Sequence, residues 1–152
     1  MTRLRQYSDN NTQPQVIGFV CNWSAYSGVE IAGINQRIYP ANLRLVKLMC
    51  LGRLNPGLVL KAFELGADGV VLLGCPSDDC HYESGMEKAK ETFAQAKKLL
   101  RLLGIDQKRL ALVEVPIGRD DILTRKVLSF VRSTSKTISS RKGRRIAKAI
   151  LA

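Results

Sequence analysis

The four cysteines and the single histidine are the residues of this chain best suited to bind a metal or to act as nucleophiles. Cys75, Cys80 and His81 lie in one short segment, GCPSDDCHY at 74–82, whereas Cys21 and Cys50 stand alone in the sequence. In a reducing compartment, clustered thiols more often bind metals or catalyse reactions than form disulfides. Whether these four act together depends on the elements that position them.

The hydrophobic pattern predicts strands that alternate with helices. Short apolar and β-branched runs predict strands at 15–20, 43–49, 68–74 and 109–115, and helical patterns lie at 27–37, 56–65, 86–103 and 120–132. The second helix has Asn55 as its expected N-cap and Pro56 at its first position. This order predicts an α/β fold, a single open parallel sheet of about four strands with helices on both faces, similar to flavodoxin and Rossmann folds.

Three of the cysteines close predicted strands. Cys21, Cys50 and Cys75 each stand at or just after the end of a strand, and the carboxyl ends of parallel strands share one edge of the sheet. Cys80, in the loop after Cys75, completes a set of four thiols. Four thiolates suit tetrahedral zinc or an iron–sulfur cluster. His81 directly follows Cys80, so we interpret it as a loop residue rather than a ligand.

Catalysis by a thiol is the weaker interpretation of the same residues. A nucleophilic cysteine needs a base or a helix N-terminus that lowers its pKa. The chain contains no glycine-rich phosphate loop, and GRLNPG at 52–57 lacks the spacing of a dinucleotide-binding motif. The sequence therefore favours a metal site over a nucleotide or nucleophile site.

The positive charge is concentrated near the C-terminus. Nine of the 24 Lys and Arg residues follow position 121, where the sequence has no Asp or Glu. We expect a polar leader at 1–15, an α/β domain at 16–132 and a basic extension at 133–152 that is flexible at its start. Such an extension suits an acidic partner, an anionic membrane surface or nucleic acid. Phe130 is its one nearby aromatic residue, so base stacking is poorly supported, and a disordered or partner-docking extension is preferred.

The sequence has no membrane-spanning pattern and no signal-peptide pattern. Apolar runs stay well short of the roughly 18 residues that cross a bilayer. The leader is polar, which predicts a cytoplasmic protein.

Three blocks of the sequence resemble a known family. FVCNWSAYSGVEIAG, YPANLRLVKLMCLGR and KAFELGADGVVLLGCPSDDCHYESG are similar to the delta (iron–sulfur) subunit of methyl-viologen-reducing hydrogenase, from about Val16 to Val115. The resemblance implies a non-catalytic electron-transfer subunit with one [2Fe–2S] cluster. It implies relay between a hydrogenase, or another donor enzyme, and the flavin subunit of heterodisulfide reductase.

The resemblance also assigns residues. It places the cluster ligands at Cys21, Cys50, Cys75 and Cys80. The family pattern usually opens C-N-W-C, whereas this chain has Ser24 at the second cysteine position. Asn22 and Ser24 are then expected beside the cluster as hydrogen-bond donors, or Ser24 as an altered ligand. Two alternatives remain, a structural zinc-stabilised interaction module and a nucleic-acid-binding protein that acts through the basic tail.

Aromatic and basic side chains are predicted near the same edge of the sheet. The aromatic set serves either packing or partner contact, and the basic set either pairs with partner carboxylates or is solvated. These residues are Trp23, Tyr26, Tyr39 and Tyr82, with Arg37, Arg44 and Arg53.

Overall fold

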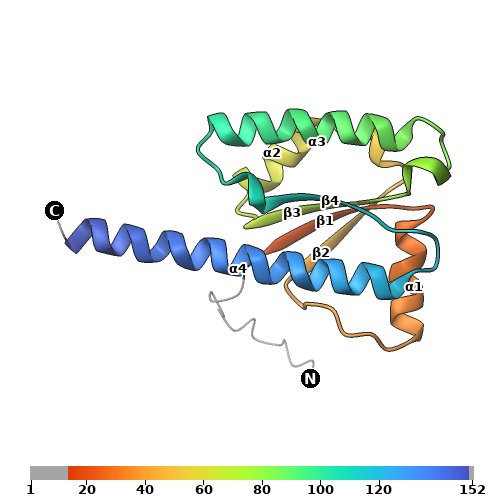
Figure 1. Ribbon diagram of the computed structural model, residues 1–152, viewed down its shortest axis with the longest axis horizontal. Helices are drawn as coiled ribbons and strands as arrows, with labels where there is room; N and C mark the ends of the chain where they lie inside the picture. Colours follow the sequence, from red (N-terminus) through yellow and green to blue (C-terminus); the bar gives the residue numbers. More distant parts are fainter. Residues whose placement is uncertain (1–13, 151–152) are drawn as a thin grey trace, which may run out of the picture.

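The computed structural model describes residues 14–150, and the side chains of residues 14–139. The predicted leader at 1–15 therefore lies almost entirely outside the described residues. Four parallel strands form one sheet, in the order β2-β1-β3-β4 (Figure 1). The strands are β1 (Val16–Cys21), β2 (Leu43–Leu48), β3 (Gly69–Gly74) and β4 (Leu110–Glu114).

Helices cover both faces of the sheet. They are α1 (Ala25–Ile34), α2 (Pro56–Glu64), α3 (Gly85–Leu102) and α4 (Asp120–Ile150), with short 3-10 turns η1 (Leu51–Arg53), η2 (Ser77–Asp79) and η3 (Gln107–Arg109). Helices α2 and α3 lie on one side of the sheet and α1 and α4 on the other (Figure 1). The predicted α/β class, the parallel sheet and the helices on both faces are all confirmed.

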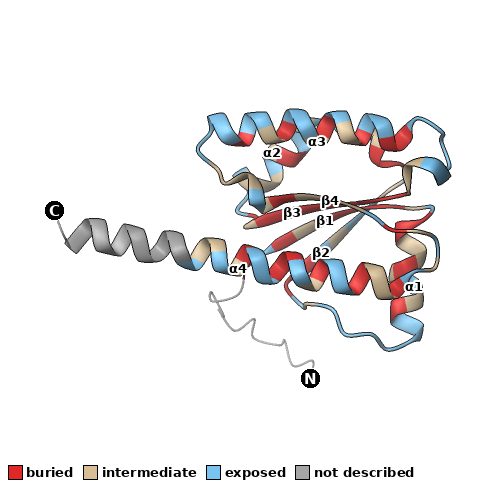
Figure 2. Ribbon diagram, in the orientation of Figure 1, coloured by how far each residue is buried: buried red, intermediate tan, exposed pale blue. Residues whose placement is uncertain are grey.

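Alternating side chains of each central strand enter two separate cores. On β3, Val70 and Leu72 pack on the α2–α3 side, whereas Val71 and Leu73 pack on the α1–α4 side. Every residue of β3 is buried (Figure 2). A strand covered on both faces needs a continuous apolar run, and this explains why GVVLLG has no polar alternation.

Local sequence signals fix the helix that begins at Pro56. The Asn55 side chain accepts a hydrogen bond from the Leu58 amide at 3.0 Å, as expected for an N-cap. Gly66 follows the helix with φ of 99°, in the left-handed region that glycine adopts at little cost.

The last helix departs from the prediction. It does not end near Arg132 but continues as α4 to Ile150, past the end of the sheet (Figure 1). Thr134 is fully buried against Gly69, and its hydroxyl donates to the Phe130 carbonyl at 3.0 Å. Thr137 makes the same bond to Ser133. The Ser/Thr-rich composition predicted that the helix would end here, because such side chains can compete for backbone hydrogen bonds. The two threonine hydroxyls instead bond to carbonyls within the helix, so the helix continues.

The role of the basic extension at 133–152 stays a prediction. The side chains from residue 140 onward lie outside those that the structure describes.

Candidate functional site

The four thiols converge at the carboxyl edge of the sheet. Cys21 is the last residue of β1, Cys75 directly follows β3, and Cys50 stands two residues after β2. All three are buried, and Cys80 is half-buried in the loop before α3. The parallel topology thus brings together residues that are up to 59 positions apart, as their places at strand ends predicted.

Cys21 and Cys75 form the tightest pair. Their Sγ atoms are 3.5 Å apart, and both cysteines are free thiols. A disulfide would need about 2.0 Å between the sulfurs. Two thiolates on one tetrahedral ion with bonds of about 2.3 Å would be roughly 3.8 Å apart. The observed separation is therefore close to that of two ligands on one metal.

Cys50 and Cys80 both approach the start of α3. A Cβ atom placed on Gly85 would lie 2.5 Å from the Cys50 Sγ and 3.1 Å from the Cys80 Sγ. Only glycine leaves room for both sulfurs at this point. Both thiols therefore border a notch at Gly85 that any larger residue would fill.

A second glycine holds the Cys50 loop against α3. A Cβ on Gly52 would lie 2.8 Å from the Gly85 carbonyl oxygen and 3.0 Å from its Cα. The two backbones can approach this closely only because both residues lack a side chain. Sequence reasoning missed both glycines, although a glycine in the first turn of a long helix is a poor helix former and was a usable signal.

Backbone amides surround the thiols. The Gly52 N–H donates to the Cys50 Sγ at 3.3 Å, and a hydrogen bond from the His81 amide reaches the Cys75 sulfur. At the N-terminus of α3, the Ser84 side chain makes no capping bond. Free N–H groups and the helix dipole favour negative charge there. These amides favour the thiolate form and partly oppose the effect of burial on Cys50 and Cys75.

Burial disfavours the ionised form of two of the thiols, Cys50 and Cys75. Burial raises the pKa of the Cys75 thiol, and the neighbouring Cys21 thiol raises it further. Burial also raises the pKa of Cys50, partly offset by the Gly52 amide. A nucleophilic cysteine needs the opposite shift, so these two thiols are suited to metal binding rather than catalysis.

The thiols do not form one closed cage. Within the described part of the chain, no group of three or more His, Cys, Asp and Glu side chains is placed to enclose a single ion. The Cys21 and Cys75 sulfurs are in contact, and the Cys50 and Cys80 sulfurs both lie beside Gly85. Four soft thiol donors at one edge suit thiolate-bound zinc or an iron–sulfur group.

Polar contacts fix the loop between Cys75 and Cys80. The Ser77 hydroxyl, at the start of η2, donates to the Glu114 carboxylate at 3.0 Å and accepts a hydrogen bond from Lys90 of α3. Lys90 also pairs with Glu114 at 3.2 Å. This chain of contacts ties the cysteine loop to both α3 and β4.

An aromatic group lies at the surface next to Cys80. The rings of Trp23 and His81 stack with centroids 3.7 Å apart at 16°, and Tyr82 meets both rings edge-on. All three side chains are exposed. His81 thus contributes a ring contact and a backbone amide, in agreement with its interpretation as a loop residue.

Asn22 and Ser24 make backbone contacts at the same edge. The Asn22 amide donates to the Leu48 carbonyl at 2.8 Å and extends the pairing of β1 with β2. The Ser24 side chain is buried, and its hydroxyl donates to the Val115 carbonyl, just after β4. Neither bond involves a cysteine sulfur, and the expected role of these residues beside a cluster stays a prediction.

The other predicted aromatic and basic residues are spread more widely, although Arg53 lies in η1 directly after Cys50. Tyr26 packs under the Lys47 ammonium at 4.2 Å, and Tyr39 packs against Leu43 at the opposite end of β2. Arg37 pairs with Asp120 of α4 at 3.0 Å. Of the four aromatic residues predicted at the cysteine edge, Trp23 and Tyr82 form the exposed group there.

This fold and site define a small α/β protein with converging thiols at the carboxyl edge of a parallel sheet. The model of the family described as methyl-viologen-reducing hydrogenase, delta subunit, matches residues 16–137. The chain belongs to this family, which confirms the resemblance seen in the sequence.

Relatives of two kinds support the same assignment. The chain is 41% identical over 100 residues to the iron–sulfur subunit of the vhc F420-non-reducing hydrogenase of Methanococcus voltae, covering 66% of this chain and 69% of that protein. It is 38% identical over 100 residues to the iron–sulfur subunit of the F420-non-reducing hydrogenase of Archaeoglobus profundus, covering 66% of this chain and 73% of that protein.

The second kind of relative is a much longer protein. It is one of the subunits of the ferredoxin:CoB-CoM heterodisulfide reductase of Methanosarcina mazei, 35% identical over 133 residues, or 87% of this chain. The chain spans only 17% of that protein. Among the described helices, none has the length and apolar character needed to cross a membrane.

Proposed function

We propose that this protein is an electron-transfer subunit that holds one [2Fe–2S] cluster on Cys21, Cys50, Cys75 and Cys80. The convergence of four cysteines at one edge of the sheet carries the proposal, because a [2Fe–2S] cluster takes four protein ligands, two on each iron. Cys21 and Cys75, whose sulfurs are 3.5 Å apart, would share one iron, which leaves Cys50 and Cys80 for the other. The names of the relatives, which are iron–sulfur subunits, support the class of cofactor.

A bound cluster would supply one-electron transfer, and the chain supplies its environment. The amides of Gly52 and His81 donate toward sulfur, which stabilises negative charge and tunes a redox potential. The buried positions of Cys21, Cys50 and Cys75 keep water from most of the thiol set. No group here has to move a proton or open a coordination position.

We further propose that the electron donor is a hydrogenase or a similar enzyme, and that the acceptor is the flavin subunit of heterodisulfide reductase. The relatives named as subunits of a hydrogenase and of a heterodisulfide reductase support this pair of partners. Trp23, Tyr82 and Met49 expose 37%, 46% and 53% of their surface beside the thiols. Exposed aromatic and Met side chains are enriched in protein interfaces, and they offer a contact face close to the cluster.

Anaerobic purification from cells that load iron–sulfur clusters tests the cofactor. We expect a coloured protein with about two irons and two sulfides per chain, and an electron paramagnetic resonance signal after one-electron reduction. Replacing any of the four cysteines by Ser should remove most of the iron. Thermal unfolding of each variant without metal serves as the control for folding.

A colourless protein with stoichiometric zinc and no iron would contradict the proposal. That result would favour the alternative, a zinc-stabilised interaction module on the same thiols. Loss of iron from only one or two of the cysteine variants would contradict the ligand set but not the class of cofactor.

A further inference from the structure

An open groove of about 660 Å³ runs along α4 on the side of the sheet away from α2 and α3. Side chains from α4 and from the loop after α1 line it. The lining residues that matter here are Arg37, Asp121, Arg125, Leu128, Arg132 and Lys136. The proposed electron-transfer function uses none of them.

Three cations of this groove are not neutralised within the described residues. Arg37 pairs with Asp120, and Asp121 pairs with Arg119 through two bonds of 2.8 Å. Arg125, Arg132 and Lys136 are exposed, and no described carboxylate forms an ion pair with them. The groove therefore presents a net positive surface.

The spacing of the three cations places them on one face of the helix. Intervals of seven and four residues return to the same side of an α-helix and span about 16 Å along its axis. Leu128, half-buried, lies between them in sequence and lines the same groove. The groove thus combines a row of charges with an apolar contact.

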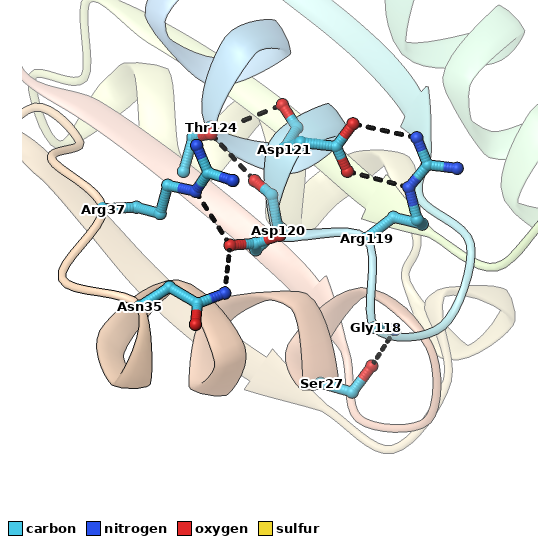
Figure 3. A network of polar contacts seen from close by, with 8 residues as sticks. All are labelled: Ser27, Asn35, Arg37, Gly118, Arg119, Asp120, Asp121 and Thr124. Carbon is cyan, nitrogen blue, oxygen red and sulfur yellow. Dashed lines mark hydrogen bonds and ion pairs between the residues drawn. The ribbon is translucent and has the colours of Figure 1, made fainter.

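A polar network adjoins the groove and includes two of its lining residues, Arg37 and Thr124. Asp120 accepts hydrogen bonds from Asn35 at 2.9 Å and from Arg37 at 3.0 Å, and Thr124 donates to the Asp120 carbonyl at 2.8 Å (Figure 3). These bonds hold the loop after α1 against the first turns of α4. Arg37 is thereby held at the groove, so this part of the site is in place before binding.

We propose that this groove binds an acidic helical segment of a partner protein. Carboxylates spaced by four and seven residues would face Arg125, Arg132 and Lys136, and an apolar residue would cover Leu128. No aromatic side chain lines the groove as described, so it offers no stacking platform for nucleic-acid bases.

This inference does not depend on the bound cluster, because the groove and the thiols lie on different parts of the molecule. Cys21 and Cys75 pack in the core of the α2–α3 side, whereas the groove lies over the α1–α4 side. The partner is expected to touch the protein at a second place, away from the electron-transfer edge.

Fluorescence anisotropy with a labelled peptide tests the groove on the full chain. The probe is an 18-residue Ala- and Leu-based helix with Glu at spacings of four and seven, and the control peptide carries Gln at the same positions. The triple variant R125E/R132E/K136E should bind the Glu peptide at least tenfold more weakly at low salt. Wild-type binding should weaken steeply as salt is raised.

The matched control variant is K98E/R101E/K108E. These three cations are equally exposed, lie on α3 and η3, and give the same change of charge. We expect its affinity to fall less than threefold. An equal loss in both variants would overturn the proposal, because it would show attraction to the overall charge alone.

If the triple variant binds no Glu peptide, a peptide of opposite charge distinguishes a changed groove from a protein that no longer binds at all. A peptide with Lys in place of Glu should bind R125E/R132E/K136E better than it binds the wild type, and failure of this gain counts against the groove. Should the triple variant be unfolded by circular dichroism, R125Q alone is expected to weaken the Glu peptide about threefold, and no change would overturn the proposal. Tighter wild-type binding to a single-stranded oligonucleotide or to phosphatidylglycerol vesicles than to the Glu peptide would also overturn it.

Discussion

The α2–α3 side and the α1–α4 side of the same sheet are built on different physical principles. On the α2–α3 side, Cys21 and Cys75 are embedded in an apolar core, and the sulfurs meet backbone amides and glycine notches. On the α1–α4 side, Asp120 and Arg37 form an ion pair near the surface, and cations without a described carboxylate partner line a groove. Thiol ligands are compatible with a buried site where backbone amides approach the sulfur atoms. Charged side chains need either water or a partner of opposite charge.

The comparison shows that a small α/β domain can have two functional surfaces, one on each side of its sheet, that depend on different residues. Alternation along the strands sends neighbouring residues to opposite cores, so each face is set by its own residues. A substitution on one side should therefore leave the other side intact. Three substitutions, each with a control, test whether the two sides are independent.

The largest effect is expected from Gly85→Ala. The added methyl group would lie 2.5 Å from the Cys50 Sγ and must displace it or the start of α3. We expect iron content after anaerobic purification to fall at least fivefold, with peptide binding at the α4 groove unchanged.

Gly33→Ala is the control for this variant. Gly33 lies in α1, and a Cβ there meets no atom within 4 Å. It should keep full iron and gain about 0.5–1 kcal/mol of helix stability. Full iron loading in Gly85→Ala would show that the sulfurs are not held at this notch.

Ser24→Ala is expected to have an intermediate effect, on stability rather than on the metal. The Val115 carbonyl would lose the hydroxyl that donates to it in a buried position. Leaving a buried acceptor unsatisfied costs about 1–3 kcal/mol of unfolding free energy, measurable by urea denaturation. Iron per folded chain should stay at the wild-type level.

The companion variant Ser24→Cys restores the C-N-W-C pattern of the family. If Ser24 acts only through Val115, its iron content and redox potential should match those of the wild type. A large shift of the potential in Ser24→Cys, or loss of iron in Ser24→Ala, would place residue 24 against the cluster instead.

The smallest effect is expected from Asp120→Asn, and it depends on pH. Hydrogen bonds from Asn35 and Arg37 lower the pKa of Asp120 below its ordinary value of 3.8. The ionised carboxylate therefore stabilises the folded state fully above about pH 4. That contribution is lost as the pH falls through the lowered pKa.

Urea unfolding at pH 7, 5 and 3 measures this dependence. Wild type should be more stable than Asp120→Asn at pH 7 and 5, and the difference should shrink at pH 3. Glu91→Gln, an exposed neutralisation on α3 with no described ion pair, should show no such trend. A constant difference at all three pH values would contradict the role of the Arg37–Asp120 contact.

Individual residues show which features of the fold and site could be predicted from the sequence. The run GVVLLG and the Asn55–Pro56 start predicted a buried strand and a helix because the signals are local, and both are present. The place of Cys21, Cys50 and Cys75 at strand ends predicted their convergence, since parallel strands share one carboxyl edge. The predicted end of the last helix, at Arg132, was wrong. Thr134 is buried against Gly69, and this contact with a residue 65 positions away in the chain supports the helix beyond Arg132.

The α/β class, the order of the elements and the presence of four thiols follow from the amino-acid sequence, because periodicity and residue type act over short distances. The tertiary structure was needed to show that the Cys21 and Cys75 sulfurs lie 3.5 Å apart, that Gly52 and Gly85 must be glycine, and that Arg125, Arg132 and Lys136 border a groove with Arg37. Those features depend on close approach between segments far apart in the chain. Such approach is set by the packing of whole elements, which no local pattern encodes.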